Sequence, residues 1–161
     1  MLLDTPIGQL RDTEQDRQST QYATFVIGHL FFGIDVLMVQ EVLRFQEMTR
    51  VPLAPHVVEG LINLRGQIVT ALDVRRRLGL PPKTGEYEPM SIVVRTADGP
   101  VSLLVDDIGD VIEVDAELFD SPPENLDSKA RDLISGVYKL ESRLLLVLDT
   151  ERAVEVAGGV S

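Results

Sequence analysis

The alternation of apolar and polar positions divides this chain into many short segments. From Tyr22 onward, runs rich in Val, Ile, Leu and Phe are separated by Gly, Pro and Asp. The runs recur at intervals of roughly 8 to 12 residues, which is typical of small β barrels or of a sandwich. We predict ten strands, at residues 22–27, 31–39, 41–46, 61–64, 67–72, 91–96, 101–106, 110–114, 136–140 and 143–148.

Tight turns and short helices are also indicated. Asp98-Gly99 stands between two apolar runs, and this pair accepts the positive φ angles of a hairpin turn. A helix is expected to begin after Asp73, an N-cap residue, and to end at Gly79. Asp149 is a second candidate N-cap residue. Three short helices are therefore predicted, at residues 74–78, 128–135 and 150–154.

The strongest break in the pattern is the segment from Pro81 to Pro89, with five predicted strands before it and five after it. We therefore expect an all-β domain with short helices, built as two barrels at about residues 22–80 and 87–154. The sequence leaves open whether the barrels exchange strands near residue 85. Residues 1–21 hold few apolar positions and are expected to form a mobile leader, and residues 155–161 a frayed tail.

The charge balance excludes several classes of partner. The 161 residues include 15 Lys and Arg against 26 Asp and Glu, a net charge of −11. Nucleic acid and anionic lipid would repel such a chain, so protein partners are favoured. The chain has no cysteine, no signal-peptide pattern and no apolar run long enough to span a membrane. A cytoplasmic location is expected, and any link to a membrane is indirect.

No catalytic pattern is recognisable. The two histidines, His29 and His56, have no carboxylate at metal-ligand spacing. Asp106, Asp107 and Asp110 lack the spacing of a calcium loop, which favours a solvated strand end over a cation site. The chain has no phosphate-binding loop, nucleophile elbow or zincin motif. We expect no enzyme activity, no metal and no cofactor.

Two segments hold candidate interface residues. Alternation in segment 60–73 assigns one face to the core, with Ile62, Leu64, Ile68 and Leu72. Arg65 is exposed whether this segment is one strand or a hairpin turning at Gly66, so it is either an interface anchor or paired with an acidic neighbour. Segment 33–43 is more apolar than a half-buried strand, which marks a barrel corner or an exposed patch. The basic run 75–77 is favoured as a solvated helix face.

Four pieces of the chain together point to a known family. Residues 22–33 match an opening hairpin, and Gly33-Ile-Asp-Val-Leu-Met-Val-Gln-Glu-Val42 matches the signature Gly-Ile-Asp-x-x-x-Val-x-Glu. Asn63-Leu-Arg-Gly66 and the later Leu72-Asp73-Val74-Arg75 match Asn-Leu-Arg-Gly and Asp-Leu-Arg elements. Val105-Asp106, with Ile108 and Val111, is similar to a Val-Asp-x-Val-x-x-Val element. In these motifs the chain closely resembles the CheW family of chemotaxis coupling proteins.

The resemblance implies two SH3-like five-stranded β barrels and a non-catalytic adaptor. Such an adaptor joins the cytoplasmic tip of chemoreceptors to the regulatory domain of a CheA-type histidine kinase, and is recruited to membrane receptor arrays. Carried over by position, Arg65, Val39 and Glu41 match receptor-contact positions, and Gly60 and Ile62 are expected to belong to the same receptor-binding surface because they lie close to it. The expected kinase-binding positions are Val58 and Ile108.

Three alternatives stay open at the level of sequence. The first is a paralogous CheW-like coupling protein of a non-chemotactic receptor–kinase pathway, such as surface motility. The second is a domain of a larger signalling enzyme, against which the ends at Met1 and Ser161 count. The third is an enzyme of a class without recognisable motifs.

Overall fold

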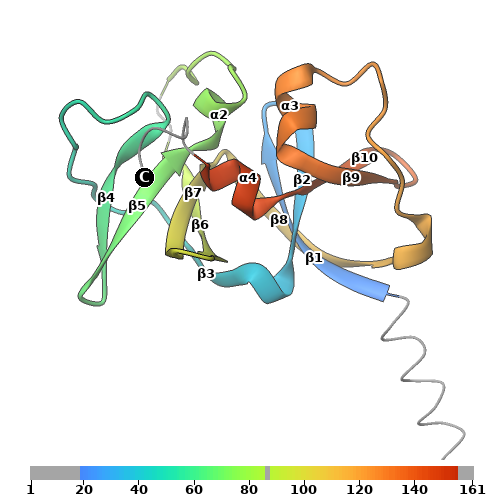
Figure 1. Ribbon diagram of the computed structural model, residues 1–161, viewed down its shortest axis with the longest axis horizontal. Coiled ribbons are helices and arrows are strands. Elements are labelled where there is room, and N and C mark those ends of the chain that lie inside the picture. Colours follow the sequence, from blue (N-terminus) through green and yellow to red (C-terminus); the bar gives the residue numbers. More distant parts are fainter. Residues whose placement is uncertain (1–18, 86–87, 156–161) are drawn as a thin grey trace, which may run out of the picture.

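The computed structural model describes residues 19–85 and 88–155 (Figure 1). Along the chain, groups of two or three strands are separated by short helices. The strands are β1 (Ser19–Ile27), β2 (Leu30–Asp35), β3 (Val39–Leu43), β4 (Val58–Leu64), β5 (Gln67–Asp73), β6 (Met90–Thr96), β7 (Gly99–Val105), β8 (Asp107–Asp115), β9 (Ile134–Lys139) and β10 (Leu144–Leu148). The helices are α2 (Val74–Arg77), α3 (Ser128–Leu133) and α4 (Thr150–Val154), with 3-10 turns η1 (Val36–Met38) and η2 (Ala116–Leu118). The predicted all-β class with short helices is confirmed.

Several predicted boundaries differ by a few residues from those of the structure, and two of these differences have an identifiable cause. The strand expected over 31–39 ends at Asp35, because the Asp35 carboxylate accepts a hydrogen bond from the Leu37 amide (2.9 Å) and caps η1. The leader expected over 1–21 ends early, because Ser19 to Gln21 pair with Glu113 to Asp115 of β8. The rest of that leader, 1–18, lies outside the described residues, as do 156–161 of the expected tail.

The ten strands form two five-stranded sheets that do not follow the break at Pro81–Pro89. The first has the order β8-β1-β2-β10-β9 and the second β3-β6-β7-β5-β4. The second sheet is therefore built from the continuous segment 39–105, inserted between β2 and β8 of the first. Each barrel combines strands from both sides of the break: β1 and β2 join β8, β9 and β10, and β6 and β7 join β3, β4 and β5, which is the strand exchange that the sequence left open. Turn chemistry specifies hairpins and carries no information on the parallel pairs β2–β10 and β5–β7.

Each sheet closes into a barrel by the same device. After β3, Thr49 and Leu61 of β4 exchange two backbone hydrogen bonds of 2.8 Å. After β8, Asp120 and Val137 of β9 exchange two such bonds of 2.9 and 2.8 Å. Each bridge joins the two edge strands of its sheet through the segment that follows one of them. The fold is two five-stranded barrels, consistent with the SH3-like type; we call them the first and second barrel.

A glycine stands beside each closing bridge. A Cβ at Gly60 would lie 2.7 Å from the Thr49 carbonyl oxygen, and a Cβ at Gly136 would lie 2.7 Å from that of Asp120. Real Cβ atoms do not approach oxygen so closely, so only glycine permits the two strands to meet here. Gly60 is buried and serves the closure of the second barrel.

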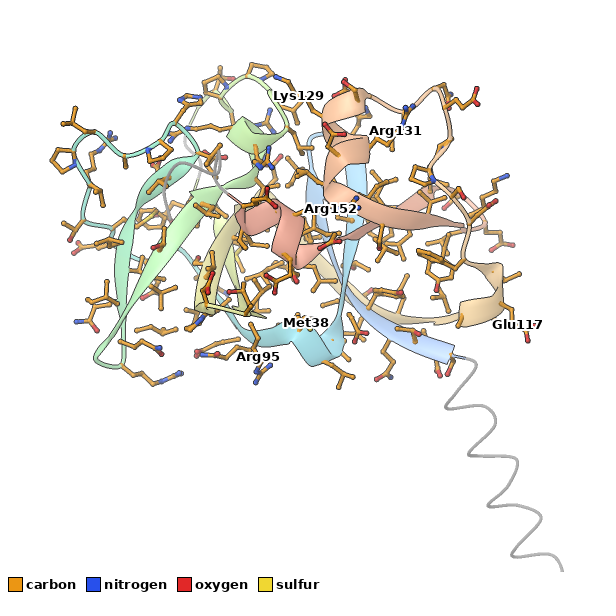
Figure 2. All side chains as sticks on the ribbon, in the orientation of Figure 1. Met38, Arg95, Glu117, Lys129, Arg131 and Arg152 are labelled. Atoms are coloured by element: carbon orange, nitrogen blue, oxygen red, sulfur yellow. The ribbon has the colours of Figure 1, made fainter. Side chains whose placement is uncertain are left out.

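The chain crosses between the barrels twice, and an arginine stabilises each crossing. At the first, η1, Arg95 of β6 donates through Nη1 to the carbonyl oxygen of Val39 (2.8 Å), and Figure 2 shows Arg95 beside η1. At the second, Asp106 lies between β7 and β8. Its carboxylate accepts from Arg75 Nη1 and from the Gly28 amide, both at 2.7 Å.

The basic run 75–77 was expected to form a solvated helix face, and the aspartates 106, 107 and 110 a solvated strand end. Both expectations were wrong in part. The Arg75 side chain is 14% exposed and that of Asp106 5%, so neither is a solvated surface group. Arg76 pairs with Glu59 at 2.6 Å. Asp73 caps helix α2, and Arg75 and Arg76 line a pocket together with residues of the segments 45–59 and 80–89. Asp107 and Asp110 are exposed, as expected.

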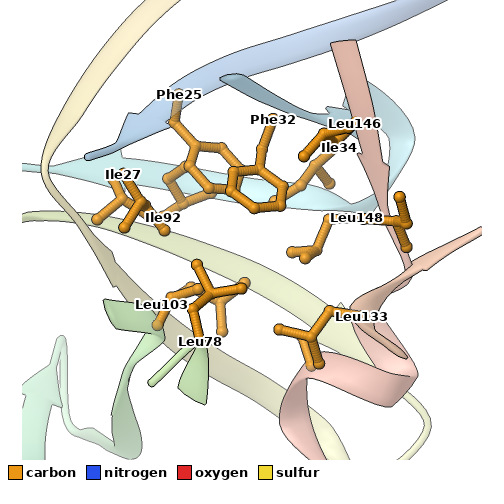
Figure 3. Close-up of a cluster of buried hydrophobic side chains, with 14 of the residues drawn as sticks. Phe25, Ile27, Phe32, Ile34, Leu78, Ile92, Leu103, Leu133, Leu146 and Leu148 are labelled. Atoms are coloured by element: carbon orange, nitrogen blue, oxygen red, sulfur yellow. The ribbon is translucent and has the colours of Figure 1, made fainter. Parts of the chain in front are cut away.

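Most of the core lies between the two sheets (Figure 3). Phe25 and Phe32 stack with ring centroids 5.3 Å apart, and they pack with Ile92 and Leu103 of the second barrel. Helices α2, α3 and α4 add apolar side chains to this central core. Smaller clusters fill each barrel: Tyr22, Tyr138, Leu145 and Val147 in the first, and Ile62, Leu64, Val69 and Val93 in the second. Some strands are buried on both faces. This explains why a run such as 144–148 is apolar at every position and does not alternate with polar residues.

We expect Asp106→Ala to lower the free energy of unfolding by about 3 kcal/mol, because it leaves a largely buried guanidinium and the Gly28 amide without their acceptor. Chemical denaturation measures the loss. Asp110→Ala, an exposed aspartate four residues on, is the control, with an expected change within about 0.5 kcal/mol. Equal effects of the two variants would contradict the role of Asp106.

Gly60→Ala should also destabilise the fold, by about 1 to 3 kcal/mol, because the added methyl group overlaps the Thr49 carbonyl. Hydrogen exchange at the Leu61 amide, which donates to Thr49, would accelerate more than exchange in the first barrel. A variant with wild-type stability and exchange would show that this closure is not needed.

Candidate binding surface

The β4–β5 hairpin carries Arg65 at its tip. Arg65 and Gly66 have φ angles of 53° and 86°, the left-handed pair of a type I′ turn, and the Gly66 amide donates to the Asn63 side chain (2.9 Å). The hairpin interpretation of this segment is correct. A two-residue turn resets the alternation, so Ile68 points outward, 61% exposed, and its predicted place in the core was wrong.

Arg65 forms a forked ion pair with Glu41 of β3. Its Nη1 donates to Glu41 Oε2 at 2.8 Å and its Nη2 donates to Oε1. These hydrogen bonds lower the pKa of Glu41 below its ordinary value and raise that of Arg65. The Glu41 side chain is 16% exposed but that of Arg65 74%, so one face of the guanidinium remains open to a partner. The structure does pair Arg65 with an acidic residue, but the partner is 24 residues away on another strand and is not the local neighbour that the sequence offered as an alternative.

The other positions carried over from the family lie at different depths. Ile62 is 2% exposed inside the second barrel, and Gly60 is buried at its closing bridge, so neither presents much surface. Both support the hairpin that carries Arg65. Val39 is half-buried where β3 begins, against the central core. The structure thus brings Arg65 and Glu41 together, while Val39 of the same strand as Glu41 packs against the central core.

Val58 and Ile108 are not brought together. Val58 opens β4 in the second barrel and Ile108 lies on β8 in the first, and both pack partly against the central core. Neither is among the large exposed apolar residues, although Val111, on the same strand as Ile108, is 58% exposed.

Some exposed apolar residues on β3, on β5 and on η1 were not predicted from the sequence, or were predicted only as one of two alternatives. Val42, next to Glu41, is 43% exposed, and Ile68 lies three residues after Arg65. Leu37, in η1, is 78% exposed. Both interpretations of segment 33–43 hold, because η1 turns a corner and also presents Leu37. The excess of apolar residues in that segment was the available signal.

Groups that could support other functions are sparse in the part of the chain that the structure describes. His29 and His56 are exposed on loops. In residues 19–85 and 88–155, no three His, Cys, Asp or Glu side chains gather as a metal site would require. No helix within these residues has the length and apolar character needed to cross a membrane.

Comparison with known proteins gives a consistent result. A family model described as the CheW-like domain matches residues 21–157, which include both barrels. The Chemotaxis protein CheW of Treponema pallidum is 31% identical over 136 residues, 82% of this chain and 80% of that protein. That of Bacillus subtilis is 29% identical over 143 residues, 89% of this chain and 92% of that protein.

A solved structure agrees with these relatives. The crystal structure of the scaffolding protein TtCheW from Thermoanaerobacter tengcongensis superposes with a TM-score of 0.77 and 26% identity, covering 86% of this chain and 94% of that one. The similarity extends over both barrels and over nearly the whole length of the relative. The chain belongs to the CheW-like family of chemotaxis proteins.

Proposed function

We propose that this protein is a chemotaxis coupling adaptor that joins the cytoplasmic tips of chemoreceptors to a CheA-type histidine kinase. The observation that carries the proposal is the match of both barrels to a protein described as a scaffold. An adaptor acts by holding surfaces at fixed positions, and two barrels that share a central core supply rigid surfaces. Relatives described as chemotaxis proteins favour this pathway over a surface-motility paralogue.

The receptor contact is proposed at the hairpin tip, through Arg65, Glu41 and Val39. Glu41 engages two of the donors of Arg65 and holds the guanidinium in one orientation, which lowers the entropy lost on binding. The exposed side of the guanidinium can then donate to a receptor carboxylate or carbonyl. Val42, on the strand that carries Glu41, and Ile68, on the hairpin that carries Arg65, are exposed apolar residues, and apolar surface of this kind excludes water from a charged contact.

The kinase contact is proposed near Val58 and Ile108. Because these residues lie in different barrels, a kinase domain would engage either barrel separately or reach across both. Both sides offer apolar surface: exposed Val111 lies on β8, and exposed Val51 and Leu53 line a hollow together with Val58. Weak contacts of this kind suffice in a receptor array, where many copies bind together.

The adaptor has no catalytic role in this proposal, and it reaches the membrane through the receptors. Kinase regulation would then follow from placement of the kinase beside the receptor tip. Each partner binds its own surface, and the common core keeps the two surfaces at a constant distance.

Arg65→Glu should leave the fold intact but lower receptor-tip binding by about tenfold or more, because an exposed contact charge is reversed. Co-sedimentation with receptor-tip assemblies and kinase, together with kinase autophosphorylation, measures the effect. Arg143→Glu, an exposed arginine on the first barrel, is the matched control. The double variant Arg65→Glu, Glu41→Arg restores an internal ion pair and should not restore binding. Recovery of binding in the double variant would show that Arg65 only supports the hairpin.

The pair should also be visible in the titration of Glu41. A carboxylate with a depressed folded-state pKa stabilises the fold above its unfolded pKa, and this contribution disappears as pH falls through the folded value. In a carbon-detected NMR titration, the Glu41 carboxyl should therefore have a midpoint below the ordinary glutamate value, and Arg65→Gln should return it toward that value. An unchanged midpoint in Arg65→Gln would mean that the ion pair does not form in solution.

A further inference from the structure

Three arginines from three helices line one cleft at the junction of the barrels. Arg77 comes from α2, Arg131 from α3 and Arg152 from α4, and Figure 2 shows Arg131 and Arg152 on neighbouring helices. We call this cleft, of about 600 Å³, the arginine cleft. Its other lining residues are Pro122, Asp132, Ile134, Ser135 and Glu155.

The arginine cleft is remote from the proposed receptor surface. Strand β5 begins beside the Arg65 turn and ends at Asp73, where α2 begins, so α2 stands at the opposite end of the second barrel (Figure 1). Arg77 joins the barrels at this end, donating through Nη2 to the carbonyl oxygen of Arg152 (3.3 Å). A ligand here would therefore not compete for the hairpin tip.

Two of these arginines lack the anionic partner that comparable arginines have. Four described arginines are half-buried, and two of them pair with carboxylates, Arg75 with Asp106 and Arg76 with Glu59. The other two, Arg77 and Arg131, have only carbonyl oxygens as acceptors: Arg77 that of Arg152, and Arg131 those of the loop 123–126.

Hydrogen-bond donors of these two guanidiniums are also unused. The Nε atoms of Arg77 and Arg131 are buried and have no hydrogen-bond partner among the described residues. The buried Nε atoms themselves are out of reach of a ligand, but a partly desolvated guanidinium without an anionic partner costs free energy that an anion in the cleft would recover in part. Among the described residues, no ion pair joins Arg77 or Arg131 to a carboxylate, although Asp132 and Glu155 line the same cleft.

We propose that the arginine cleft binds the carboxylate groups of an acidic, extended segment of a partner protein. Guanidinium groups accept carboxylates through paired, parallel hydrogen bonds. The cleft is far larger than one carboxylate, so it holds a segment of several residues. Pro122 and Ile134 give it apolar surface that suits the methylene groups of glutamate side chains.

The same cleft is poorly suited to phosphate esters. Asp132 and Glu155 also line it, so the three arginine charges are partly offset. A phosphate dianion concentrates its charge at one point beside these carboxylates, whereas an extended segment distributes single charges along the cleft, each beside a guanidinium. The charge balance of the lining therefore favours carboxylates.

NMR titration of the whole protein tests the site, because the Nε–Hε signals of Arg77 and Arg131 report directly on the guanidiniums. The probes are an acetylated and amidated hexaglutamate peptide, the matching hexaglutamine peptide and inorganic phosphate. We expect saturable shifts of both signals with hexaglutamate only. Shifts with hexaglutamine, stronger binding of phosphate, or no shift with any probe would each overturn the proposal.

Variants separate the site from general charge effects. Arg77→Gln removes a single internal hydrogen bond and should weaken hexaglutamate binding by about tenfold while the protein stays folded. Arg131→Lys keeps the charge but loses the fork, and should also weaken binding. Arg143→Gln, on the exposed surface of the first barrel, is the control and should bind as wild type. Loss of binding in the control, or wild-type binding by Arg77→Gln, would show that the peptide does not occupy the arginine cleft.

Discussion

The largely buried ion pair between Arg75 and Asp106 fixes the place where the chain returns from the second barrel to the first. Asp106 lies between two strands of different barrels, and its carboxylate also holds the Gly28 amide at the turn between β1 and β2. One carboxylate thus links helix α2, the crossing and the first hairpin. A largely buried ion pair adds less to the free energy of unfolding than apolar packing in the same place would. Its geometry, however, specifies one arrangement of the barrels. The central core depends on that arrangement, because its side chains come from both sheets.

The shared core explains how a small protein can serve as a coupling element. The barrels cannot shift against each other without separating Phe25 and Phe32 from Ile92 and Leu103. The hairpin tip with Arg65 and the helical end with the arginine cleft therefore keep a constant separation. Such rigidity allows a partner bound at one surface to be positioned relative to a partner bound at another.

The local features of the fold were predictable, and the long-range ones were not. The positions of the ten strands and the turn at Gly66 follow from alternation and turn chemistry, which act between neighbours in sequence. The insertion of segment 39–105 into the first sheet rests on the parallel pairs β2–β10 and β5–β7, which no local pattern specifies. For the candidate site, the residue spacing correctly predicted that Arg65 is exposed, but it could not predict which residue Arg65 pairs with. Glu41 lies 24 residues earlier, and only the closed barrel brings the two together.

The inserted arrangement of the barrels has a consequence for synthesis on the ribosome. All strands of the second barrel have been made once Val105 leaves the exit tunnel, whereas the first barrel lacks β8, β9 and β10 until Leu148 follows. During that interval the β1–β2 hairpin has no β10 beside it, and Phe25 and Phe32 lack the side chains of Leu146 and Leu148. The nascent chain therefore exposes an aromatic hairpin with an unpaired edge, the kind of surface that chaperones recognise and that aggregates when synthesis stalls.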